Sequence, residues 1–170
     1  MKSNLILSLL TLIISTSTLF SQDSFQMPLE DWELEINIDG FKIEKEGYSP
    51  DSTMFQLSAT NGKTNISLSI FIEKTDSKGD KEECRKYYWT KAKNSPLAKE
   101  NLNQYETDDL AIVEHDTKEF NGQVVDFHSL NAYLVQKGYW MDIHISKAGY
   151  TKKDKKLFKK IVESITIKSI

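Results

Sequence analysis

The chain has few of the residues that cross-link a fold or bind anions. It contains one cysteine, Cys84, so no disulfide can form within it and its apolar core must hold the fold. Its 22 basic residues comprise one arginine, Arg85, and 21 lysines. Because arginine is the usual residue for bidentate contacts with phosphate or carboxylate, this scarcity argues against a phosphate-handling enzyme.

The sequence also has no excess of positive charge. Lysine and arginine number 22 against 25 acidic residues, and the formal net charge is −3 at pH 7. A nucleic-acid-binding protein needs a basic surface, so we expect no nucleic-acid partner. We find no nucleophile–base pair, metal-spaced cluster or phosphate loop either. We therefore expect no catalytic residues, no metal, no cofactor and no enzymatic activity.

The one long apolar run stands at the N-terminus and has the pattern of a secretory signal peptide. A basic start, Met1-Lys2, precedes the apolar run from Leu5 to Ile14. Small polar residues follow from Ser15 to Thr18, and then Leu19-Phe20-Ser21. The run is shorter than the roughly 20 residues that span a bilayer. We expect cleavage of residues 1–21 and a periplasmic or secreted protein, with residues 22–170 as a single α+β domain. An uncleaved N-terminal anchor is the alternative.

The first part of that domain alternates apolar and polar residues with a period of two, which is typical of half-buried strands. Trp32 to Ile38 has this pattern, and it resumes after a turn at Asp39-Gly40. Gln22 to Gln26 is expected to be a loose lead-in, and Glu46 to Asp51 a loop.

Asn61-Gly62 predicts a β-hairpin with a two-residue turn. This register pairs Leu57 with Ile66 and Phe55 with Leu68. All four apolar residues then share one face, so the turn and the hydrophobic pattern agree.

A helix is predicted from about Lys81 to Lys93, capped by Asp80. Cys84, Tyr88 and Ala92 recur at helical spacing and should face the sheet. An aromatic ligand platform or a reactive Cys84 is the functional interpretation, and simple packing is the other. Packing is favoured, because acidic neighbours disfavour a thiolate. The following segment, from Pro96 to Asp109, has no clear period and fits either a short helix or a crossover loop.

A second helix is predicted from Lys152 to about Ser164, with Thr151 and Asp154 as its cap pair. Its apolar stripe needs a sheet to lie on. Its lysine-rich face could touch an anionic membrane or remain solvated, and we expect no membrane contact because the apolar stripe is already used.

The strands around Asn121-Gly122 allow two registers. A two-residue turn pairs His115 with His128, which could begin a metal site. A longer turn with a bulge pairs Asp116 with His128 instead. The pattern does not decide between them.

The strand from Tyr139 to Lys147 carries the candidate binding residues. Tyr139 and its alternate neighbours should face the core, and Trp140, Asp142 and His144 should face solvent or a cleft. An exposed tryptophan beside an acid and an imidazole is typical of a ligand-binding or partner-binding surface. The alternative is an aromatic residue that covers the second face of the sheet beneath a helix.

The order of these elements resembles the PsbP-like sandwich proteins, including the DcrB-like bacterial proteins. Pro28-Leu29-Glu30-Asp31-Trp32 is similar to their Leu-Pro-x-x-Trp opening, with proline and leucine transposed. Phe120-Asn121-Gly122-Gln123 resembles their central hairpin, and Gly138-Tyr139-Trp140 their closing strand. The resemblance implies an antiparallel sheet with helices on both faces and an accessory or chaperone-like binding role. It supplies no catalytic residues.

We therefore predict an α+β fold: an antiparallel sheet of about six or seven strands with two helices packed on it. The predicted function is an exported, non-enzymatic binding module of the bacterial cell envelope, whose partner is another envelope or extracellular protein. The alternative is a small-molecule carrier or a metal-dependent hydrolase that uses the face of Trp140, Asp142 and His144. The hydrolase requires His115 and His128 to converge with His144.

Overall fold

The computed structural model describes residues 22–94 and 99–170. The predicted signal peptide and the first residues of the segment predicted as a short helix or crossover, 96–98, lie outside this range.

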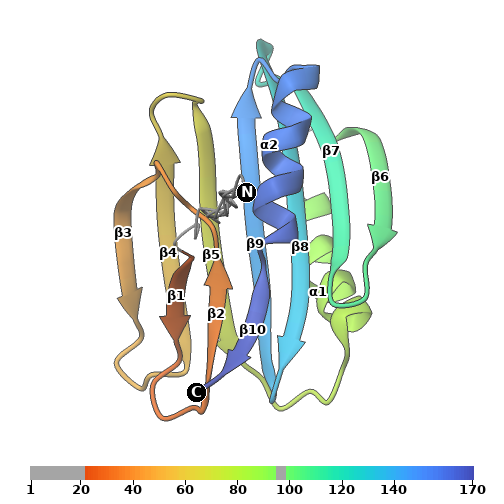
Figure 1. The fold of residues 1–170 in the computed structure, drawn as a ribbon. Helices are drawn as coiled ribbons and strands as arrows, with labels where there is room; N and C mark the ends of the chain where they lie inside the picture. Colours follow the sequence, from red (N-terminus) through yellow and green to blue (C-terminus); the bar gives the residue numbers. More distant parts are fainter. Residues whose placement is uncertain (1–21, 95–98) are drawn as a thin grey trace, which may run out of the picture.

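The larger of two sheets has seven antiparallel strands in the order β3-β4-β5-β9-β8-β7-β6 (Figure 1). The strands are β3 (Lys42–Tyr48), β4 (Met54–Asn61), β5 (Ile66–Lys74), β6 (Glu100–Glu106), β7 (Ala111–Phe120), β8 (Gln123–Gln136) and β9 (Tyr139–Ala148). The α+β prediction of six or seven antiparallel strands is confirmed.

A second, smaller sheet has the order β1-β2-β10. Its strands are β1 (Asp23–Gln26), β2 (Trp32–Ile36) and β10 (Thr166–Ser169). The prediction of a loose lead-in at Gln22 to Gln26 is therefore wrong, because β1 pairs with β2. β10 was not predicted: four residues after a helix are too few to show a period. The central strand buries Trp32, Leu34 and Ile36 completely.

The two helices cover opposite faces of the seven-stranded sheet, as the resemblance implied (Figure 1). α1 (Lys81–Lys93) packs on β8, β9 and β7. α2 (Lys152–Glu163) shares the other face with the small sheet, and its Phe158, Ile161 and Val162 enter the main core. Neither described helix has the length and apolar character needed to cross a membrane.

The cap predictions for both helices are confirmed. Asp80 accepts hydrogen bonds from the backbone N–H groups of Glu82 and Glu83 at the start of α1. At the start of α2, the Thr151 N–H donates to Asp154 at 2.8 Å. Asp154 also accepts a hydrogen bond from the Lys147 ammonium at 2.6 Å, which ties the helix to β9.

Cys84 belongs to the smaller core beneath α1. It is fully buried, and its thiol lies 3.6 Å from the Met141 carbonyl oxygen. Burial raises the pKa of Cys84 to about 12. The packing interpretation of this helix therefore accounts for Cys84, and the thiol is not poised as a nucleophile.

The first hairpin has a different register from the predicted one. Leu57 pairs with Ile70 and Phe55 with Ile72, because four residues rather than two separate β4 from β5. The Asn61 side chain accepts hydrogen bonds from the Lys63 and Thr64 N–H groups, which shapes this wider turn. The partner of each β4 residue moves by four positions along β5. Because that shift is even, the apolar residues keep a common face.

The second hairpin combines parts of both predicted alternatives. Phe120 pairs with Gln123 across a two-residue turn, yet Asp116 pairs with His128. An extra residue in β8 changes the register between these points, and Asp126 adopts a positive φ of 46° there. The bulge lies within the strand and not at the turn.

Two segments predicted as irregular form the outer edges of the larger sheet. The segment from Pro96 to Asp109 contains β6, and the predicted loop at Glu46 to Asp51 contains the end of β3. All residues of β3 and β6 are exposed. A strand exposed on both faces needs no apolar alternation, which is why the period-two pattern is missing from β6 and from the end of β3.

Candidate functional site

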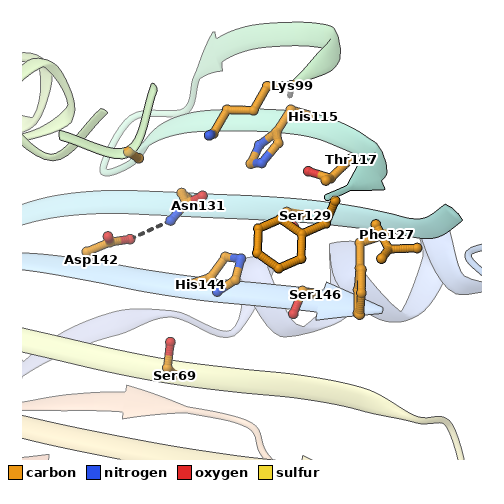
Figure 2. Close-up of a pocket in the computed structure, with 13 residues that line it drawn as sticks. Ser69, Lys99, His115, Thr117, Phe127, Ser129, Asn131, Asp142, His144 and Ser146 are labelled. Atoms are coloured by element: carbon orange, nitrogen blue, oxygen red, sulfur yellow. Dashed lines mark hydrogen bonds between the residues drawn. The ribbon is translucent and has the colours of Figure 1, made fainter. Parts of the chain in front are cut away.

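A pocket of about 500 Å³ opens on the α1 face of the seven-stranded sheet (Figure 2). It lies beyond the C-terminal end of α1, whose Ala92 forms part of the wall. The lining residues are Ser69, Ala92, Lys99, His115, Thr117, Phe120, Val125, Phe127, Ser129, Asn131, Asp142, His144 and Ser146.

Polar side chains from four neighbouring strands form the floor (Figure 2). Ser69 of β5 pairs with His144 of β9, which pairs with Asn131 of β8. In the next row Ser146 of β9 pairs with Ser129 of β8. Cross-strand partners project to the same face, so the register alone brings these groups together. Small serines rather than large apolar residues leave the space above the floor empty.

Asp142 lies on the floor and accepts a hydrogen bond from the Asn131 amide at 2.9 Å (Figure 2). Burial raises the pKa of Asp142 to about 6, and the Asn131 hydrogen bond opposes that shift only in part. Among the residues that the structure describes, no lysine, arginine or histidine lowers it. The carboxylate is thus charged at neutral pH without a strong counterion from the described chain.

Two histidines face the same pocket. His115 is 7% exposed, and burial, followed by the charge of Lys99, lowers its pKa to about 4. Burial also lowers the pKa of His144. Both imidazoles are therefore neutral at pH 7, and each can donate one hydrogen bond and accept one. They can orient a polar ligand without adding charge.

The third histidine lies elsewhere. His128 Nδ1 is 2.8 Å from Asp116 Oδ1, and its ring stacks on Tyr150 at 3.9 Å on the α2 face of the sheet. The three imidazoles of the hydrolase alternative therefore do not converge. Within residues 22–94 and 99–170, no group of three or more His, Cys, Asp or Glu side chains is placed to hold a metal ion.

The three predicted site residues separate into two environments. Asp142 and His144 line the pocket, but Trp140 does not. Trp140 is 6% exposed and packs beneath α1, with its ring 5.2 Å from that of Tyr87. The prediction of an exposed Trp140 is wrong, and the alternative of an aromatic covered by a helix describes this position.

Sequence reasoning missed the rest of the floor. Asn131, Ser129 and Ser69 occupy strand positions that should carry apolar residues if a helix covered them. Polar residues at such positions were the available signal. This signal is informative only once it is known that α1 covers just one end of this face of the sheet.

No protein-family model and no curated protein matches the chain. Among solved structures, the chain is similar to the solution structure of cyanobacterial PsbP (CyanoP) from Synechocystis sp. PCC 6803. The TM-score is 0.54 at 15% sequence identity, and the match covers 91% of this chain and 96% of that one. At this identity the likeness establishes the fold alone, which is PsbP-like as the sequence resemblance predicted.

Proposed function

We propose that the protein is an exported, non-enzymatic binding module and that its ligand is a small molecule held in the pocket on the α1 face. The single observation that carries this proposal is the pocket itself. Its volume of about 500 Å³ lies within the range typical of small-molecule sites. This proposal develops the carrier alternative from the sequence.

The lining supports a binding role. A polar floor with fixed hydrogen-bonding groups faces an apolar side that includes Phe120, Val125 and Phe127. Small-molecule sites combine apolar walls with a few polar groups that fix orientation. Export rests on the pattern of residues 1–21, and N-terminal sequencing of the protein from an envelope or culture fraction should find Gln22 first.

Native mass spectrometry of the protein purified from its own host tests the proposal. We expect a small-molecule adduct that is released unchanged on denaturation. Ser69→Trp should fill the pocket and remove the adduct. Gln56→Trp is the matched control, because Gln56 is exposed on the same face of neighbouring β4, outside the pocket. A wild-type protein without adduct contradicts the proposal, and a chemically altered ligand favours an enzyme.

Partner binding is a second candidate, because apolar side chains are exposed around the β7–β8 turn. Val124 is 86% exposed, Phe127 40% and Phe120 38%, so this tip offers an apolar contact beside the pocket mouth. Affinity capture from an envelope extract should recover one reproducible protein with the wild type and lose it with Val124→Asp. Val124→Thr is the control for shape, and equal recovery with all three proteins contradicts a partner at this tip.

A further inference from the structure

The charges in the pocket are unevenly distributed. Asp142 lies on the floor in β9, and Lys99 lies in the wall at the start of β6 (Figure 2). Lys99 lowers the pKa of His115, so its positive charge acts at the β7 side. It is not among the groups that shift the pKa of Asp142. The β9 side of the pocket is therefore the negative side.

One positive charge acts close to Asp142: Arg85 of α1 opposes the rise in the pKa of Tyr133, the cross-strand partner of Asp142. Arg85 is ion-paired with Glu106 at 3.5 Å and is not among the groups that shift the pKa of Asp142.

The charge of Asp142 also acts on Cys84 and Tyr88 of α1 and on Tyr133 of β8. Burial raises the pKa of each of these groups, so all three stay protonated and uncharged. The neighbouring His144 is neutral at pH 7 because burial lowers its pKa. Glu73 of β5, which hydrogen-bonds Tyr88 at 2.6 Å, is a second acid on this face.

The orientation of α1 also makes the electrostatic potential at the pocket wall more negative. Its last turn reaches the pocket at Ala92, so the C-terminal end of the helix, with its partial negative charge, lies at the wall. A half-buried carboxylate without a strong counterion is unfavourable, and a ligand cation would supply the missing charge. The two contributions come from different elements and favour the same sign of ligand.

The apolar wall is suited to the rest of such a ligand. Phe120 and Phe127 line the pocket and are about two-fifths exposed, at 38% and 40%. The faces of aromatic rings attract cations and pack against flat apolar groups. Phe127 lies six residues along β8 from Tyr133, the partner of Asp142, which is about 20 Å at the rise of a strand. The pocket thus offers a carboxylate for a charged head at one end and aromatic rings for the far end of an elongated ligand.

We infer that the pocket selects an organic cation, a protonated amine joined to an elongated apolar group, with its ammonium on Asp142 and the far end of its apolar part directed toward Phe120 and Phe127. This inference rests on the proposed function and names the class of ligand. The positive charge of Lys99 repels an ammonium from the β7 side and so restricts it to the β9 side. The site therefore discriminates ligands by where their charge lies as well as by its sign.

Three probes of similar shape test this inference: benzylamine as the cation, benzyl alcohol as the neutral analogue and benzoate as the anion. Titration calorimetry at pH 7.5 should show benzylamine binding about tenfold or more tightly than benzyl alcohol, with benzoate weakest. Ser69→Trp should abolish binding of all three and so report whether the pocket is the site.

Asp142→Asn keeps the volume and can keep the hydrogen bond from Asn131, but it removes the charge. We expect benzylamine to lose its preference, falling to within about twofold of benzyl alcohol, while benzyl alcohol is unaffected. Asp126→Asn is the control, because it removes an exposed carboxylate from the hairpin tip. It should leave the preference intact.

The outcomes separate the two proposals. Equal binding of the three probes, blocked by Ser69→Trp, overturns the inference but leaves the pocket as a binding site. Preferred binding of benzoate, or a preference that survives Asp142→Asn, also overturns the inference. Failure of every probe to bind, together with no co-purified adduct, overturns the proposed function and the inference with it.

Discussion

His115 and His128 belong to the two strands of one hairpin, yet their rings lie on opposite faces of the seven-stranded sheet. His115 lines the pocket on the α1 face, and His128 stacks on Tyr150 on the α2 face. The bulge at Asp126 causes this separation, because a one-residue change in register reverses which side chains share a face. Without it, the two imidazoles would be cross-strand partners.

The bulge should be sensitive to the backbone preference of the residue at position 126. Asp126 has a φ of 46°, which β-branched residues strongly disfavour. We expect Asp126→Val to lower the free energy of unfolding by about 1–2 kcal/mol more than Asp126→Gly. Both variants lose the exposed contact with Lys118, so their difference in urea denaturation isolates the backbone. Equal stabilities would contradict a strained bulge.

The Lys147–Asp154 pair should matter far more than a surface ion pair. Their side chains are 15% and 7% exposed, and Asp154 also caps α2. Asp154→Asn leaves a buried ammonium without its counterion, so we expect a loss of about 2–4 kcal/mol in the free energy of unfolding. Glu163→Gln, in the exposed Lys159–Glu163 pair, is the control and should change stability by less than about 0.5 kcal/mol. Similar effects from both would show that Lys147–Asp154 behaves as a surface pair.

Asp142 should destabilise the free protein at neutral pH. Its folded pKa of about 6 is above the ordinary value of 3.8, so between these limits the folded state binds more protons than the unfolded state. The stability associated with protonated Asp142 is complete below about pH 4 and is lost as the pH rises through about 6.

Asp142→Asn should remove this pH dependence. We expect the variant to be about 3 kcal/mol more stable than the wild type at pH 8 and nearly equal to it at pH 4. Chemical denaturation at the two pH values measures the difference. A constant difference across this range would mean that Asp142 is not the titrating group.

Trp140 should act through stability and not through ligand affinity. It is buried beneath α1 and contacts Tyr87, and it does not line the pocket. Trp140→Ala should lower the free energy of unfolding by about 3–5 kcal/mol because it leaves a large cavity. Val124→Ala, at an 86% exposed position, should change it by less than about 0.5 kcal/mol. A stable Trp140→Ala protein that had lost its ligand would contradict this assignment.

The sequence predicted the two faces of β9 correctly but not what covers them. Alternation placed Trp140, Asp142 and His144 on one face, and the structure confirms this. The coverage of that face depends on where α1 stops, so Trp140 is buried whereas His144 faces an open pocket. Periodicity within a strand carries no information about how far a helix from another part of the chain extends across it.

Registers were predictable only where the apolar pattern could tell them apart. At Asn61-Gly62 the predicted and the observed registers differ by an even number of residues, so both bury the same side chains. The hydrophobic pattern therefore could not reveal the four-residue turn. The bulge at Asp126 shifts the register by one residue, which reverses the face on which each β8 side chain lies. Both faces of β8 carry polar and apolar side chains, so the hydrophobic pattern fits either register. Exposed edge strands such as β6 have no apolar alternation at all.

The strand order of the small sheet also sets an order of events during synthesis. β2 is translated early, but one of its two neighbours is β10, from the opposite end of the sequence. Until the ribosome has completed Thr166–Ser169, one backbone edge of β2 has no partner, and α2 is also newly made. Closure of the second layer over the main sheet therefore waits until β10 has been made.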